Sequence, residues 1–250
     1  MKNKNTSKIL VYMTTLLVVL LCGCSDQTKW DDFKKYIEDG QISYTGKLDS
    51  VKIYSGRDRV KFRARVPADP KVVKVAISWN KGLSRKDYDV NMETLRKEWI
   101  EKDSTGRPVL DLFTSVPEGV HSFTLTTFDA DGRQSVPVYI TGRSYGQRYQ
   151  QAIANKVVNN VTRLAPNADL QINWFAFDKS LGAEGIEFDY LDQEGKRVLL
   201  KDFSIDAERV VVPKFTKDAS TMKYRTIFRP NRHAIDTFYT ESVTLNIPKF

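Results

Sequence analysis

A predicted β-hairpin over Glu118–Thr141 constrains the fold of this chain more than any other stretch of the sequence. Apolar and polar residues alternate on both sides of an Asp129–Gly132 turn, which is the period of two typical of half-buried strands. The inward positions are Phe123, Leu125 and Thr127 before the turn and Val136, Val138 and Ile140 after it. A hairpin cannot bury its apolar face alone, so the sequence predicts a second sheet packed against it.

Similar strand patterns recur along the chain and predict an all-β protein. In residues 41–143 they give about seven strands with turns every 8–12 residues, the spacing of an immunoglobulin-like β-sandwich. A second series follows in residues 144–250, where Leu170, Ile172 and Trp174 are expected to share a buried face. We therefore expect two tandem sandwiches of one topology, joined at residues 141–151, where glycines are expected to loosen the chain.

The longest break in the strand pattern is Asn80–Arg107. Asn91 is placed to cap a short helix within it, and Tyr88 and Trp99 supply flat rings that can stack on a sugar. Long loops often carry function, so Tyr88 and Trp99 are the predicted ligand-binding residues. The alternative is that both rings form a small local core beneath this segment.

Residues 1–23 have the pattern of a signal peptide, with a basic start, the apolar run Ile9–Leu21 and a cysteine at its end. The run is short for a membrane-spanning helix. The ending resembles a bacterial lipobox, in which Cys24 becomes the lipidated first residue of the mature protein. Residues 24–40 are then a polar tether, and the lipid on Cys24 would bind the membrane. The alternative is an ordinary secretory signal.

Composition excludes several classes of function. The chain has two cysteines, Cys22 and Cys24, so a lipidated mature protein has no disulfide and its core must supply its stability. The net charge of +8 is not gathered into a basic stripe, so no nucleic-acid partner is predicted. No motif for nucleotide, cofactor or zinc-protease chemistry occurs, and no cofactor is predicted.

The histidines and the turn acids favour structural roles. His121 and His233 fall in different predicted domains, which does not suggest a shared metal site or a catalytic triad. His121 is therefore expected to be structural. Asp129 and Asp131 begin like a calcium loop but lack the remaining ligands, so a plain turn is favoured and no metal is predicted.

Two pairs of acids, Asp189 with Asp192 and Glu184 with Glu187, have the residue type of a glycosidase site. Small sandwiches without a large cleft seldom host such a pair, so the chain is predicted not to be an enzyme and to have no catalytic residue. Phe175 and Phe177 lie on the opposite face of the strand from Trp174. They are expected to pack at the junction of the sandwiches, or alternatively to bind ligand.

The C-terminal half carries the most specific resemblance. The segments Lys223–Pro230 and Ala234–Thr240, together with the Glu118–Thr141 hairpin, resemble an uncharacterised family of Bacteroidota surface lipoproteins with two fibronectin type III-like halves. The resemblance implies an outer-membrane, surface-exposed lipoprotein that assists glycan binding or presentation in a polysaccharide-utilisation system. The sequence departs from the resembled family at His121, where relatives usually have an aromatic residue. The alternative function is a structural or adhesion module that positions a partner protein.

Overall fold

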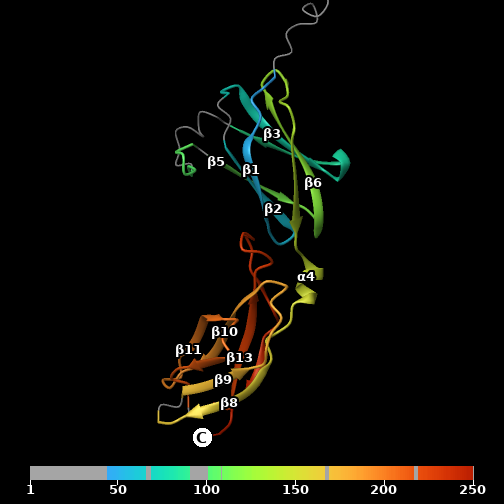
Figure 1. Ribbon diagram of the computed structural model, residues 1–250. Coiled ribbons are helices and arrows are strands. Elements are labelled where there is room, and N and C mark those ends of the chain that lie inside the picture. The colour runs from blue at the N-terminus through green and yellow to red at the C-terminus, as the bar shows by residue number, and fades with distance from the viewer. Residues whose placement is uncertain are drawn as a thin grey trace, which may run out of the picture. The chain divides into compact units, whose positions relative to one another are not determined.

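The structure is a computed structural model that describes residues 44–65, 69–90, 101–107, 109–166, 169–216 and 219–249 (Figure 1). The predicted signal peptide and tether, Cys24 and the predicted helix cap Asn91 lie outside these residues. Both predicted sandwiches belong to one unit, Tyr44–Phe250.

The first half is a sandwich of two antiparallel sheets. One sheet has the order β1-β2-β5 and the other the order β4-β3-β6-β7. The strands are β1 (Asp49–Ser55), β2 (Arg59–Arg65), β3 (Val72–Trp79), β4 (Ser84–Asp89), β5 (Val109–Ser115), β6 (Gly119–Asp129) and β7 (Val138–Ser144). The predicted hairpin is β6 paired with β7, and the predicted domain boundary at 143/144 falls at the end of β7.

The alternation in β6 is explained by burial of one face. Phe123, Leu125 and Thr127 are buried, and Phe123 meets Phe62 of the facing sheet edge to face at 4.9 Å between ring centroids. Gly132 takes the positive φ that the turn needs, +80°. Val136, predicted to face inward, precedes β7 and is exposed.

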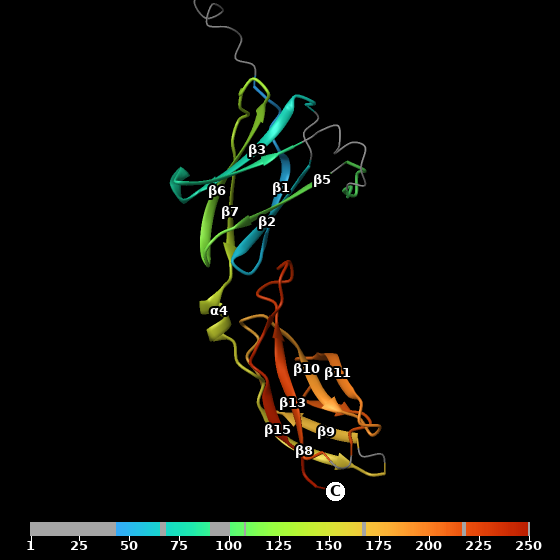
Figure 2. The same cartoon turned by 180° about the vertical axis from the view of Figure 1, so that it is seen from behind.

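The second half repeats this arrangement (Figures 1 and 2). Its sheets have the orders β12-β9-β8 and β11-β10-β13-β14, and β15 also pairs with β13. The strands are β8 (Val158–Leu164), β9 (Asp169–Trp174), β10 (Ala183–Leu191), β11 (Arg197–Ser204), β12 (Arg209–Val212), β13 (Thr221–Phe228), β14 (Phe238–Tyr239) and β15 (Val243–Asn246).

The two halves therefore share one topology, as predicted. Each places its first, second and fifth strands in one sheet and its fourth, third, sixth and seventh strands, in that order, in the other, with β14 and β15 together acting as the seventh strand of the second half. This is the strand arrangement of a fibronectin type III domain, and the fold class is confirmed.

Two regions differ from the sequence prediction. The N-terminal part of the Asn80–Arg107 segment is not irregular, because β4 pairs with β3 along Ser84–Asp89. Its sequence, SRKDYD, is polar on both faces because β4 lies at the edge of its sheet, so it lacks the alternation that marks a half-buried strand. The second region is the junction, where the helix α4 (Gln147–Ala152) follows β7.

Within the described part of the chain, no helix combines the length and the apolar character needed to cross a bilayer.

Of the two tryptophans that the structure describes, Trp79 and Trp174, the second is predicted to be the costlier to remove. It is 6 % exposed, and its ring packs against Tyr224 at 5.3 Å and Phe188 at 6.2 Å between centroids. Trp174→Ala should lower the free energy of unfolding by about 3–5 kcal/mol, measured by urea denaturation, because a large cavity is left in the second core.

Trp79 is the comparison for this prediction. It is only partly buried beside the first core, so Trp79→Ala should lower the free energy of unfolding less than Trp174→Ala does. An equal or larger loss at Trp79 would contradict the burial assigned to the two rings.

Candidate functional site

The structure gives Tyr88, a predicted ligand-binding residue, a set of partners inside the first sandwich. Its hydroxyl donates to the Phe113 carbonyl oxygen at 2.7 Å and lies 2.6 Å from Thr114 Oγ1. The ring packs against the first core. This is the arrangement expected of the local-core alternative. Trp99 lies outside the described residues, so ligand binding by this pair stays a prediction.

His121 has the structural role that was expected. Its Nε2 lies 2.8 Å from the Pro117 carbonyl oxygen four residues upstream, and its ring is 5.9 Å from that of Phe123. A hydrogen bond from an aromatic side chain back to the preceding backbone is the arrangement of a tyrosine corner. Among the described residues, no group of three or more potential metal ligands comes together.

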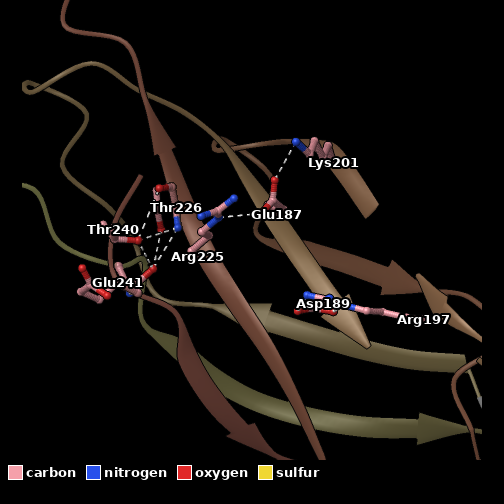
Figure 3. Close-up of polar contacts among 9 residues, drawn as sticks. Glu187, Asp189, Arg197, Lys201, Arg225, Thr226, Thr240 and Glu241 are labelled. Atoms are coloured by element: carbon pink, nitrogen blue, oxygen red, sulfur yellow. Dashed lines mark hydrogen bonds and ion pairs between the residues drawn. The ribbon is translucent and has the colours of Figure 1, made fainter. Parts of the chain in front are cut away.

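One carboxylate from each of the two candidate glycosidase pairs, Glu187 and Asp189, is held in ion pairs (Figure 3). Glu187 on β10 is 3 % exposed and accepts from Arg225 Nε on β13 at 2.6 Å, with Lys201 Nζ on β11 at 3.0 Å. Asp189 accepts two hydrogen bonds from Arg197, at 2.7 and 2.6 Å. These contacts join neighbouring strands of one sheet.

The charge state of these acids is the opposite of what a general acid needs. Burial raises the pKa of Glu187, but the bonds from Arg225 and Lys201 outweigh it, so its pKa lies below the ordinary value. The bond from Arg197 likewise lowers the pKa of Asp189. Since a general acid in glycoside hydrolysis requires a raised pKa, neither carboxyl suits that role.

The other two acids, Glu184 and Asp192, also have partners within the second sandwich. Glu184 is 3.4 Å from Arg229, and Asp192 accepts from the backbone N–H groups of Glu194 and Lys196 in the turn before β11. Asp192 therefore has the same role in the β10–β11 turn as Asp129 has in the β6–β7 turn of the first sandwich, where the Asp129 carboxylate accepts hydrogen bonds from Asp131 N and Arg133 N.

Glu187→Gln should destabilise the second sandwich by about 1–2 kcal/mol, since Arg225 and Lys201 lose a charged acceptor but remain partly exposed. Because the pKa of Glu187 is lowered on folding, its contribution is complete above the ordinary value of 4.5 and is lost as the pH falls through its folded value. The variant should therefore lose less stability than the parent between pH 5 and pH 3 in urea denaturation.

Glu184→Gln is the matched control for that experiment. The Glu184 side chain is 42 % exposed and its ion pair with Arg229 is long, at 3.4 Å, so we expect a change of about 0.5 kcal/mol or less. An equal decrease in the free energy of unfolding in both variants would show that the ion pairs of Glu187 do not stabilise the sandwich more than that of Glu184.

The specific C-terminal segments meet in the second sandwich. Thr226 N donates to Thr240 Oγ1 and to Asn155 Oδ1, each at 2.9 Å, and Thr240 Oγ1 donates to Asn155 Oδ1 at 2.6 Å (Figure 3). The Arg225 guanidinium lies 4.1 Å from the Tyr239 ring centroid. Phe238 is buried in the core. Phe238 therefore belongs to the core, and Tyr239 lies on the strand at the edge of the sheet.

The start of the segment Ala234–Thr240 contacts residues of the first sandwich. Both oxygens of the Asp236 carboxylate accept hydrogen bonds there: Oδ1 from an Arg59 guanidinium nitrogen at 2.5 Å, and Oδ2 from Arg59 Nε at 3.0 Å and Arg57 N at 2.8 Å. Ile235 N donates to the Ser55 carbonyl oxygen at 2.8 Å. We call Ser55, Arg57, Arg59, Ile235 and Asp236 the clamp.

A second carboxylate fixes the helix between the sandwiches. Glu118 lies in the connection between β5 and β6, and its carboxylate accepts hydrogen bonds from Arg148 N at 2.7 Å and Tyr149 N at 2.9 Å in the first turn of α4. Tyr149 in turn donates its hydroxyl to the Leu181 carbonyl oxygen at 2.5 Å. A carboxylate at a helix N-terminus satisfies otherwise unpaired N–H groups. The first sandwich therefore caps the helix that leads into the second.

Glycines at and near the junction allow close approach between segments of the chain. A Cβ atom on Gly56 would lie 2.6 Å from Asp236 Oδ2, and one on Gly146 would lie 2.4 Å from Asp58 Oδ1. Asp58 N and Tyr145 N also bond to backbone oxygens across this region, at 2.7 and 2.9 Å. Small residues here signal backbone proximity, which a single sequence does not distinguish from flexibility.

A cavity of about 760 Å³ opens in the second sandwich, at the ends of β9 and β12. Phe175, expected at the junction, instead lines this cavity and is 53 % exposed. Phe177 also lines it and packs against the second core near Phe228. The carboxyl end of β9 therefore presents an aromatic side chain that its own core does not use.

Lys156 forms part of the wall of this cavity. It is 3 % exposed, and its ammonium donates to the carbonyl oxygens of Ile205 at 2.6 Å and Ala207 at 2.9 Å. Burial lowers the pKa of this lysine from its ordinary value, and the carboxylates of Asp206 and Glu208 oppose that shift. No pattern in the sequence marks this lysine, because its surroundings come from separate segments of the chain.

The sequence model of a family described as a domain of unknown function matches residues 24–238. A comparison with curated proteins finds no match.

Similar solved structures contain fibronectin type III domains. A two-domain segment of chicken tenascin has 10 % identity and a TM-score of 0.30, covering 80 % of this chain and 98 % of that one. The FN1–FN3 domains of chicken CNTN1 have 10 % identity and a TM-score of 0.41, covering 83 % and 69 %. The fibronectin(III)-like modules of Clostridium thermocellum CbhA have 15 % identity and a TM-score of 0.37, covering 81 % and 94 %.

Proposed function

The chain belongs to the DUF4998 family, a domain of unknown function, and on that premise we propose that it is a non-catalytic, lipid-anchored module that holds a binding surface in a fixed position at the cell surface. The observation that carries this proposal is the clamp. Asp236 of the second sandwich accepts three hydrogen bonds from Arg57 and Arg59 of the first. A module that only tethered its second half would not need such contacts.

The clamp and the capped helix act together. Hydrogen bonds to a charged group are stronger than neutral ones, and a network that joins two bodies at separate points restricts rotation about the linker. The Arg57 guanidinium adds a contact with the Phe238 ring, 4.4 Å from its centroid. We infer that the second sandwich is presented in one orientation, as a structural or adhesion module requires when it positions a partner.

Asp236→Asn is predicted to loosen the junction, since an amide cannot serve as a charged acceptor for Arg59. The measurement is the distance distribution between spin labels on Tyr139→Cys and Leu199→Cys, two exposed positions, one in each sandwich. No cysteine follows Cys24, so the labels are unambiguous. The distribution should broaden in the variant, and Asp189→Asn, which removes an ion pair within the second sandwich, should leave it narrow.

Acid should loosen the same junction in the parent protein. The hydrogen bond from Arg59 lowers the pKa of Asp236, so the clamp is complete above the ordinary value of 3.8 and is lost as the pH falls through the folded value. A distribution that is equally broad in parent and Asp236→Asn at neutral pH would refute the proposed rigidity.

The membrane part of the proposal rests on Cys24 and the lipobox-like ending of the signal peptide. Cys24→Ala should move the protein from the membrane fraction to the soluble fraction, because the lipid is then absent. The measurement is fractionation of cells followed by immunoblotting. Continued membrane association would mean that residues 1–23 are retained as an anchor.

Glycan binding or presentation in a polysaccharide-utilisation system is the second candidate function. The cavity beside Phe175 favours it, because it combines an exposed ring with polar side chains. The outer-membrane location belongs to the same proposal.

A further inference from the structure

The cavity at the ends of β9 and β12 has the composition of a site for an uncharged, hydroxyl-rich ligand. Its wall carries two cationic side chains, Lys156 and Arg209, and two carboxylates, Asp206 and Glu208. The charges are balanced in number, and Asp206 also pairs with Lys179. A phosphate or carboxylate ligand would meet the two acids at close range, whereas an apolar ligand would leave all four charged groups unsolvated.

Polar side chains form a row that leads across the outer face of this sheet. Asn173 on β9 is in register with Arg209 on β12 and with Asn160 on β8. The Asn173 amide donates to Asn160 Oδ1 and accepts from Gln171 Nε2 at 3.4 Å. An amide both donates and accepts, as a hydroxyl does, so such a row can exchange hydrogen bonds with adjacent hydroxyls of one ligand.

Buried donors border the same cavity. Trp174 is 6 % exposed, and its Nε1 has no hydrogen-bond acceptor among the residues that the structure describes. Lys156 uses two of the three N–H groups of its ammonium on carbonyl oxygens. Buried donors are usually paired, so this wall retains hydrogen-bonding capacity that the fold itself does not use.

Phe175 supplies the remaining element. It is 53 % exposed although a phenyl ring has no polar group to hydrate, and its backbone is fixed by a 3.1 Å hydrogen bond from its N–H to the Val157 carbonyl oxygen. A ring held at the mouth of a polar cavity offers a flat apolar surface. Pyranose rings have one such face, with hydroxyl groups around the edge.

We propose that this cavity binds a neutral saccharide, with one sugar ring stacked on Phe175 and its hydroxyls bonded by Asn159, Asn173 and the charged pairs of the wall. The inference rests on the second candidate function and locates it in the second sandwich, whereas Tyr88 lies on β4 of the first. The volume of about 760 Å³ lies within the range of sites for small ligands, about 300–1,000 Å³.

The test uses isothermal titration calorimetry to measure the binding of four hexasaccharides to the detergent-solubilised full chain. The four are cellohexaose, mannohexaose, xylohexaose and a galacto-hexasaccharide. At least one of them should bind with a dissociation constant below about 10 mM. Phe175→Ala should weaken that binding about tenfold and Asn159→Ala severalfold, because both side chains are exposed at the cavity.

Phe113→Ala is the matched control. It removes an exposed phenylalanine of the first sandwich, 45 % exposed, and should leave binding unchanged. Thermal melting should show that Phe175→Ala and Asn159→Ala remain folded. The proposal is overturned if none of the four hexasaccharides binds, if binding survives both cavity variants, or if only an acidic oligosaccharide such as hexagalacturonate binds.

The outcome is separable from the rigidity of the junction. Phe175→Ala should leave the spin-label distance distribution narrow, whereas Asp236→Asn should broaden it and leave saccharide affinity within about twofold, since Asp236 does not line the cavity. Loss of affinity in Asp236→Asn alone would contradict the assigned location.

Discussion

Among the residues that the structure describes, each sheet turns an apolar face toward the other sheet of its sandwich, and no cysteine follows Cys24 to form a disulfide that would hold the two sheets together. The stability of each sandwich therefore depends on its own buried face. Phe62 and Phe123 cross between the sheets of the first half, and Trp174 packs on Phe188 and Tyr224 in the second. Because the cores are complete in themselves, the outer faces are left for other roles.

The outer face of the sheet containing β10 and β13 is used for ion pairs, and its carboxylates are held in the charged form. Glu187 and Asp189 would have to become neutral to act as proton donors, against the cations that face them. The same residue types in a deep pocket without cations would have raised pKa values. Environment, rather than residue type, separates a structural acid from a catalytic one here.

The junction shows how a linker becomes a fixed connection. Asp236 and Glu118 are carboxylates that belong to opposite sandwiches, and each accepts hydrogen bonds from segments outside its own sandwich. Each pairing is modest alone, since Arg59 is partly exposed. Placed at two points, they restrict the rotation that either one would allow. In the proposed function, a surface such as the cavity beside Phe175 is presented in a defined direction, which would favour binding because less conformational freedom is lost.

The sequence by itself determined the strands that alternate, the DADG and DQEG turns, the shared topology and the burial of Leu170, Ile172 and Trp174. These follow from local periodicity, which one stretch of chain displays. It did not reveal β4, whose edge position removes the alternation, or the roles of Gly56, Asp236 and Lys156. Only the tertiary structure decided the last three, because Asp236 bonds to Arg57 across 179 residues, Lys156 bonds to Ile205 across 49, and a contact between distant segments leaves no local pattern in either of them.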